Sequence, residues 1–520
     1  MRSIPVLNFF KEHTLFPRFS KWIFFLLLFL FSLVYSYQSI LFLSPQSIHQ
    51  WRQADCLSIT LNYYQDHNAF LQPAIHNLGP DGSGKTISEF PIVYYMVAQL
   101  FKIFGFHEFI YRLINLLIFF CGLFALFKIF ENTLKDSFFA IVLPLFLFTS
   151  PMLVYYANNF LMNSTALSLA FIGLYFFSKF FREAKNKHLY LMAFFFALSG
   201  LLKITSLLSF VAIFGIFVIE LFNIKLLGNR KIFQQPKQQI FPLLGVFLIQ
   251  LIWYSYSKSY NAKYNSGIFL IGILPVWDLS THQIQETLRF IIEHLKWDYF
   301  RRETELIFLI MWLVLFIFYK KTHKVLLFLI SLITIGVFLF IILFFQALKD
   351  HDYYTLDMAV LIPVIILTFF IFIKDNFKKL FDSLLFKIVV LFFLIHNVDF
   401  ARRRMNDRYS SLGWQNENYI KNVKVFEELT PYIRSLGITK DDKVLSLSDQ
   451  SINISLYLMN QKGWTNYGDF ASDSLKIKET MKLGAKYLFI YNKETYLEKN
   501  IEPFIKNKIG SFKQVDIYKL

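Results

Sequence analysis

Long apolar runs separated by short charged segments dominate the chain up to about residue 400. A run of roughly 18 or more apolar residues is long enough for a helix to cross about 30 Å of hydrocarbon. The pattern therefore predicts about eleven membrane-spanning helices. We expect them at residues 22–43, 109–130, 136–156, 164–181, 189–202, 204–222, 240–258, 304–319, 324–347, 355–373 and 384–400.

Two other segments have a different pattern. Residues 91–104 are apolar but too short to cross, so we expect a helix lying in the outer membrane interface. From about residue 415, helical periodicity alternates with short apolar stretches, which predicts a small α/β domain of about three strands. Gly437 and Gly484 are expected to close helices in this domain. The predicted fold is a polytopic α-helical membrane protein with a small C-terminal α/β soluble domain.

Lysine and arginine gather at alternate junctions between the apolar runs, and the positive-inside rule makes these junctions cytoplasmic. The N-terminal residues 1–21 are then cytoplasmic, and residues 22–410 form the membrane domain. The loops 44–108 and 259–303 and the soluble domain 411–520 are then extracytoplasmic. An arginine run at 402–404 opposes this assignment and leaves open an even number of spans with a cytoplasmic tail.

Composition agrees with a membrane protein, since 55% of the residues are hydrophobic and only 17% are charged. The formal net charge of +17 comes from short clusters and not from one basic face, which argues against nucleic acid as a partner. Cys56 and Cys121 are too few for a disulfide framework or a cysteine-based zinc site. The first apolar run is too long for a signal peptide and is expected to be retained. We expect an integral multi-pass protein of a bacterial inner membrane.

The stretch GPDGSGKT at 79–86 satisfies the phosphate-binding pattern G-x-x-x-x-G-K-[ST]. Such a loop needs a buried strand before it and a helix directly after it, so that backbone N–H groups converge on the phosphates. Pro73 interrupts the preceding segment, and Pro91 follows soon after. We therefore expect a flexible turn here and no nucleotide site.

Polar residues cluster in the first outer loop, around Arg52, Gln53, Asp55 and Glu89. An acid close to an arginine beside an apolar membrane is compatible with a functional site. The alternative from the residues alone is an amphipathic helix in which Asp55 is solvated or paired with Arg52.

Five motifs carry a resemblance to a known family. They are HQWRQAD at 49–55, EFP at 89–91, Arg112-Leu113, the short turn GLLKITSLLSF from Gly200, and KDHDYYTLDMAVLIPVI from Lys349. In this order they resemble membrane glycosyltransferases of the GT-C fold, and most closely the family 39 group. That group contains protein O-mannosyltransferases and the enzymes that add aminoarabinose to lipid A. The resemblance extends to about residue 370.

The resemblance implies a hexosyl- or pentosyltransferase that moves a sugar, with inversion, from a polyprenyl-phosphate donor to an acceptor on the outer face. The acceptor could be a lipid, a protein or a polysaccharide of the cell envelope. It implies that Asp55 is the general base. It also implies that Arg52, Lys203 and His351 supply positive charge for the leaving phosphate. The remaining residues assigned to substrate binding are Gln53, Glu89, Tyr353 and Tyr354.

The sequence departs from the family pattern at two places. Phe90 stands where the lipid A enzymes have a lysine, and Asp55 is not followed by the glutamate of several relatives. Lys85 could supply the missing charge or could be a solvated loop lysine, and Glu89 could instead cap the interfacial helix. A divalent cation also stays open, because possible ligand types are present without a recognised spacing. These are His49, Asp55, His76, Glu89 and His351.

Two other classes of function compete with the enzyme. A transporter or flippase of a lipid-linked saccharide would predict internal repeats and acids near the bilayer midplane, and neither is evident in the sequence. A binding or assembly protein would use the C-terminal domain to recruit a partner.

Overall fold

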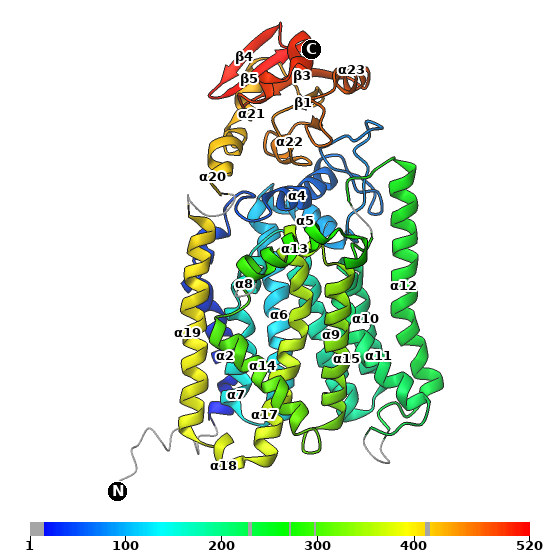
Figure 1. The fold of residues 1–520 in the computed structure, drawn as a ribbon, viewed down its shortest axis with the longest axis vertical. Coiled ribbons are helices and arrows are strands. Elements are labelled where there is room, and N and C mark those ends of the chain that lie inside the picture. The colour runs from blue at the N-terminus through cyan, green and yellow to red at the C-terminus, as the bar shows by residue number, and fades with distance from the viewer. Residues whose placement is uncertain (1–14, 227–230, 270–271, 296–297, 411–415) are drawn as a thin grey trace. The chain divides into compact units, whose positions relative to one another are not determined.

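The computed structural model describes residues 15–226, 231–269, 272–295, 298–410 and 416–520 (Figure 1). Most of the cytoplasmic N-terminus expected at 1–21 and the first residues of the expected soluble domain lie outside these ranges. The chain divides into two compact units, which are described separately. The helical unit comprises residues 1–41, 113–251 and 273–405. The sheet unit comprises residues 42–112, 252–272 and 406–520.

Helices account for the helical unit, and α6, α12 and α19 have residues in both units. The α-helices with residues in the helical unit are α2 (Leu15–Val34), α3 (Tyr37–Ile40), α6 (Glu108–Leu134), α7 (Ser137–Leu145), α8 (Pro151–Ala157), α9 (Asn163–Glu183), α10 (Asn186–Leu202), α11 (Leu208–Leu221), α12 (Pro236–Lys263), α13 (Thr281–Phe290), α14 (Arg302–Ile317), α15 (Lys324–Leu343), α16 (Ala347–Asp350), α17 (Leu361–Asn376), α18 (Lys378–Phe381) and α19 (Leu384–Tyr409). The 3-10 or π segments are η1 (Leu147–Thr149), η2 (Ile204–Leu207), η3 (Val276–Asp278), η4 (Ile291–Leu295) and η5 (Asp352–Val360).

Among the described residues, 7 helices are long and apolar enough to cross a membrane. They coincide with seven of the expected spans and lie at 108–134, 163–183, 204–221, 236–263, 324–343, 352–376 and 384–409. The other four expected spans are shorter or interrupted. The expected span 136–156 is divided between α7 and α8, because Ser150 is extended directly before Pro151, the first residue of α8. The total of eleven spans stays a prediction.

The sheet unit combines a five-stranded sheet with helices from distant parts of the chain. Its remaining helical elements are α4 (Gln50–Gln65), α5 (Ile92–Phe104), α20 (Asn416–Asn418), η6 (Tyr419–Val423), α21 (Val425–Ser435), α22 (Ile454–Leu458), α23 (Ser474–Lys482), η7 (Thr495–Leu497) and η8 (Lys499–Phe504). The strands are β1 (Lys443–Ser446), β2 (Gly463–Thr465), β3 (Ala485–Ile490), β4 (Lys508–Phe512) and β5 (Val515–Lys519).

The sheet has the order β2-β1-β3-β5-β4, with parallel pairing among β2, β1 and β3 and antiparallel pairing from β3 to β4. The expectation of about three strands was therefore wrong. The last stretch of the chain is a hairpin that turns at Lys513, whose φ is +51°. Strand β2 has only 3 residues and is too short to show an alternating pattern.

Alternation along the strands produces two hydrophobic faces. Leu445 and Leu488 pack on the face covered by α23, while Val444 and Phe489 pack on the face covered by α21 and α22. Gly437 and Gly484 follow α21 and α23 with φ of +79° and +103°, which confirms their expected place at helix ends.

The GPDGSGKT stretch packs against the edge of this sheet. Gly463 in β2 donates its backbone N–H to His76 and accepts one from Leu78, and the Trp464 indole donates to the Gly79 carbonyl at 2.8 Å. Gly84 has φ +69°, and a Cβ there would lie 2.6 Å from the Ile75 carbonyl oxygen, so the position requires glycine. The next helix, α5, begins only at Ile92. The stretch is an edge loop on the sheet and has no helix directly after it.

Candidate functional site

Helix α4 carries Asp55, the residue to which the sequence assigns the general base. The helix begins after His49, which has a left-handed φ of +56°, and most of its side chains are buried. Asp55 is only 1% exposed. A solvated Asp55 is therefore wrong, whereas the other form of that alternative, pairing with Arg52, is present as a 3.8 Å ion pair.

The Asp55 carboxylate has one close partner and one distant partner. The side-chain amide of Asn453 donates to Oδ1 at 2.5 Å, and Arg52 Nη1 lies 3.8 Å from Oδ2. Burial raises the pKa of Asp55 to about 7, the charge of Arg52 opposes this, and the charges of Glu89 and Asp449 reinforce it. Asp55 therefore changes protonation close to neutral pH.

Arg52 is held mainly by Glu89. Its Nη2 lies 2.5 Å from both carboxylate oxygens of Glu89 and 2.5 Å from the hydroxyl of Ser88, and the guanidinium lies 4.9 Å from the centre of the Phe269 ring. Nη1 is buried and has no hydrogen-bond partner among the described residues. The assignment of Arg52 to a phosphate stays a prediction, and the contacts favour a pairing role.

Glu89 does not cap the interfacial helix. The N-cap position of α5 is Pro91, without a side-chain hydrogen bond. Glu89 instead accepts hydrogen bonds from Arg52 and from the Tyr94 hydroxyl, the latter at 2.7 Å. The capping alternative is wrong.

Gln53 has a local structural contact. Its side-chain amide donates to the carbonyl oxygens of Gln46 and Ile48 at 2.8 and 2.9 Å, so it fixes the segment that leads into α4. Together, Arg52, Asp55, Glu89 and Asn453 are called the Asp55 cluster.

A second group of predicted residues lies in the helical unit. Lys203 follows α10 in an extended conformation, and its ammonium group lies 5.9 and 5.7 Å from the ring centres of Tyr353 and Tyr354. The His351 ring lies edge-on to the same two rings, at 5.4 and 5.7 Å. Four of the eight predicted site residues therefore gather here.

The structure adds Asp357, which the sequence analysis missed. Asp357 is buried, accepts a hydrogen bond from the Thr205 hydroxyl through Oδ2, and is acted on by the charge of Lys203. Its signal in the sequence was an acid inside an apolar stretch, which by itself indicates a functional site. Lys203, His351, Tyr353, Tyr354 and Asp357 are called the Lys203 cluster.

Asn453 was also missed, and here no local signal was available. It lies 398 positions from Asp55 in the sequence, in the C-terminal domain. Nothing in the periodicity of either segment indicates the contact.

The other candidate residues have separate partners. The Lys85 ammonium lies 4.8 Å from the centre of the Tyr264 ring. His76 forms a 2.8 Å hydrogen bond with the Ser58 hydroxyl, and burial lowers its pKa to about 3. Within the described ranges no group of three or more His, Cys, Asp or Glu side chains is arranged to hold a metal ion.

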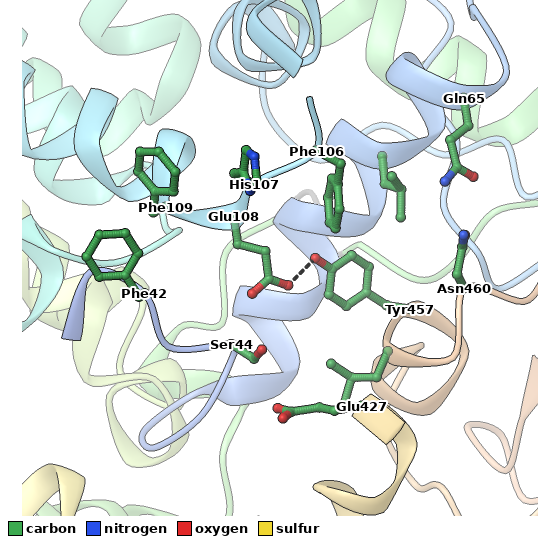
Figure 2. Close-up of a pocket in the computed structure, with 12 residues that line it drawn as sticks. Phe42, Ser44, Gln65, Phe106, His107, Glu108, Phe109, Glu427, Tyr457 and Asn460 are labelled. Carbon is green, nitrogen blue, oxygen red and sulfur yellow. Dashed lines mark hydrogen bonds between the residues drawn. The ribbon is translucent and has the colours of Figure 1, made fainter. Parts of the chain in front are cut away.

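A cavity of about 420 Å³ opens in the sheet unit (Figure 2). Aromatic rings line one part of it, and the carboxylates of Glu108 and Glu427 line another. Both carboxylates accept a tyrosine hydroxyl, since Tyr457 donates to Glu108 at 2.5 Å and Tyr419 donates to Glu427. None of the predicted site residues lines this cavity.

Comparison with known proteins gives two kinds of match. The family described as dolichyl-phosphate-mannose-protein mannosyltransferase matches residues 88–254, about a third of the chain. No curated protein sequence matches the chain.

The second kind is structural. The crystal structure of ArnT from Cupriavidus metallidurans bound to undecaprenyl phosphate matches with a TM-score of 0.61 at 10% identity, over 94% of this chain and 97% of that chain. The Archaeoglobus fulgidus oligosaccharyltransferase tethered with an acceptor peptide matches with a TM-score of 0.52 at 11% identity, over 91% of this chain and 69% of that chain. At these identities the likeness is one of fold.

Proposed function

The chain has the GT-C fold shared by these glycosyltransferases, and we propose that it is an inverting glycosyltransferase. It transfers a sugar from a polyprenyl-phosphate donor to an acceptor hydroxyl on the extracytoplasmic face of an inner membrane. The donor class is supported by the undecaprenyl phosphate bound to the ArnT structure. The family match does not favour the transporter alternative.

The observation that carries the proposal is the environment of Asp55. A general base works best when its pKa lies near the operating pH, and an ordinary aspartate with a pKa near 3.9 is a weak base. Burial raises the pKa of Asp55 to about 7, while the Asn453 amide and the Arg52 charge favour the ionised form. The carboxylate is thus both ionised in part at neutral pH and basic enough to accept a proton.

The proposed reaction follows directly. Asp55 accepts the proton of the acceptor hydroxyl while that oxygen forms a bond to the anomeric carbon. The bond between this carbon and the phosphate oxygen breaks, and its electron pair leaves with the polyprenyl phosphate. Attack on the face opposite the phosphate inverts the anomeric configuration.

The leaving phosphate needs positive charge, and the contacts favour Lys203 over Arg52 for this role. Glu89 pairs with Arg52 at 2.5 Å, whereas the Lys203 ammonium lies 5.9 and 5.7 Å from the ring centres of Tyr353 and Tyr354. Lys203 also acts on the Asp357 carboxylate, and its ammonium group has donors that can bind a phosphate oxygen.

The test is sugar transfer by the purified protein in proteoliposomes, with a panel of radiolabelled polyprenyl-phosphate sugars. Transfer from one donor is expected with wild type and is expected to be lost in Asp55→Asn. Asp66→Asn is the matched control, because Asp66 caps the same helix and is paired with Lys462. If every donor is inactive with wild type, or Asp55→Asn transfers as well as wild type, the proposal is wrong.

A further inference from the structure

We propose that the loop 449–455 of the C-terminal domain completes the active site, and that Asn453 is a positioning residue for the general base. This inference rests on the proposed function, because it concerns the same carboxylate. It gives the C-terminal domain a part in the reaction. The contact lies wholly within the sheet unit, where α22 packs beside α4 (Figure 1).

The loop is held in one conformation by its own side chains. Asp449 Oδ1 accepts the backbone N–H of Ser451 at 2.8 Å, and Asp449 Oδ2 accepts the backbone N–H and the hydroxyl of Ser455 at 2.9 and 2.5 Å. From the outer loop, the Asn77 amide donates to the carbonyl of Ile452 at 2.7 Å. Asn453 lies directly before α22. The hydrogen bonds of Asp449 and Asn77 therefore fix the backbone on both sides of Asn453 and hold its side chain against Asp55.

The contact distinguishes the two oxygens of Asp55. Oδ1 accepts the Asn453 amide at 2.5 Å, whereas Oδ2 is 3.8 Å from Arg52 Nη1, which is too long for a hydrogen bond. Asn453 is fully buried and Asp55 nearly so, which means that water does not compete for Oδ1. Oδ2 is consequently the oxygen that receives the proton of the acceptor.

Two further buried atoms point to a site that binds a ligand. Arg52 Nη1 and Asn453 Oδ1 each lack a hydrogen-bond partner among the residues that the structure describes. Buried polar atoms are rarely left without partners, and a catalytic role, a bound water or a bound ion is among the explanations for such an atom. These two atoms, a donor and an acceptor, belong to the two residues that contact Asp55.

The amide has a chemical effect besides orientation. A hydrogen bond donated to a carboxylate favours its ionised form and opposes the effect of burial. The charged groups facing Asp55 are Arg52 on its own helix, Glu89 from the segment before α5, and Asp449 from the tail loop. Without the amide, burial and the two negative charges raise the pKa of Asp55, and only the charge of Arg52 lowers it. The carboxylate is then ionised only at higher pH.

The experiment compares the pH dependence of kcat/KM for sugar transfer in proteoliposomes between wild type and Asn453→Ala. The acid limb of the profile is expected to move to higher pH by about one pH unit, the order expected when a charge-assisted hydrogen bond is lost. The KM for the donor is expected to stay unchanged. Asn453→Asp is expected to move the limb further, since it places a like charge beside Asp55.

Asn500→Ala is the matched control. It removes a side-chain amide that donates to the Ser472 carbonyl at 2.6 Å, outside the loop 449–455. Melting curves of the detergent-solubilised variants show whether each one folds. If Asn453→Ala and Asn453→Asp keep the wild-type acid limb, or if Asn500→Ala moves it equally, Asn453 is only a packing contact. These outcomes refute the inference while wild-type transfer stands, whereas an inactive wild type refutes the proposed function as well.

Discussion

The two polar clusters differ in what surrounds their cations. In the Asp55 cluster the guanidinium of Arg52 lies 2.5 Å from the Glu89 carboxylate, so its charge is compensated by a neighbour. In the Lys203 cluster the ammonium group lies over two tyrosine rings, and the Asp357 carboxylate beside it accepts a hydrogen bond from Thr205. The Arg52 charge is thus compensated by Glu89, whereas the Lys203 charge acts on Asp357 and lies over the two rings.

Each cluster offers a different chemical group to the proposed reaction. Proton acceptance requires a carboxylate that no cation holds tightly, and in the Asp55 cluster Glu89 keeps Arg52 from doing so. Departure of a lipid phosphate requires positive charge beside the leaving oxygen. The predictions below test this division of roles, beginning with the largest expected effect.

Asp55→Asn removes the proposed base without changing the size of the side chain. Loss of a general base costs about 10²–10⁴-fold in kcat, and we expect a fall in this range. Donor binding and the melting temperature are expected to stay close to wild type. A variant that retains more than a tenth of wild-type kcat would contradict the role of Asp55.

Lys203→Met keeps the length of the side chain and removes its charge. Hydrogen bonds to charged groups contribute about 1.5–3 kcal/mol, so we expect kcat/KM for the donor to fall roughly 10–100-fold. Lys203→Arg, which keeps the charge, is expected to lose less. Titration with polyprenyl phosphate gives the binding constant directly, and equal affinity in Lys203→Met and wild type would place the phosphate elsewhere.

Acidification tests the wild-type protein. Asp55 has its pKa raised to about 7, so the ionised base is present above this pH and is lost as the pH falls through it. Between pH 8 and pH 6 we expect kcat/KM to fall about tenfold. The profile should be measured with saturating acceptor, and an acid limb near pH 4 would show that Asp55 behaves as an ordinary exposed aspartate.

Glu89→Gln removes the carboxylate that pairs with Arg52 in the Asp55 cluster. Because the charge of Glu89 raises the pKa of Asp55, its removal is expected to move the acid limb to lower pH. Removing one partner of a buried ion pair is also destabilising, and we expect a loss of up to about 3 kcal/mol in the free energy of unfolding.

The double variant Arg52→Gln with Glu89→Gln is the control, since it removes both charges. It is expected to melt at a higher temperature than Glu89→Gln alone. If the double variant and Glu89→Gln have the same melting temperature, the Arg52–Glu89 pair has no measurable coupling energy. The proposed pairing role of Arg52 would then be wrong.

Much of the architecture could be read from local patterns. Seven of the expected spans coincide with long apolar helices, because hydrophobic length is a property of a continuous segment. The motifs that resemble the GT-C enzymes likewise lie in short continuous stretches. The β4–β5 hairpin and the short β2 were missed, since neither shows enough alternating residues to be distinguished from its surroundings.

The sequence by itself determined a helical protein with several apolar segments of membrane-spanning length and polar residues gathered around Asp55. Only the tertiary structure decided what each charge is paired with: Arg52 with Glu89, Asp55 with Asn453, and Asp357 with Thr205. The physical reason is that hydrophobic periodicity reports which face of a segment is buried. It carries no information about which distant side chain contacts that face. The pKa of Asp55 depends on such contacts.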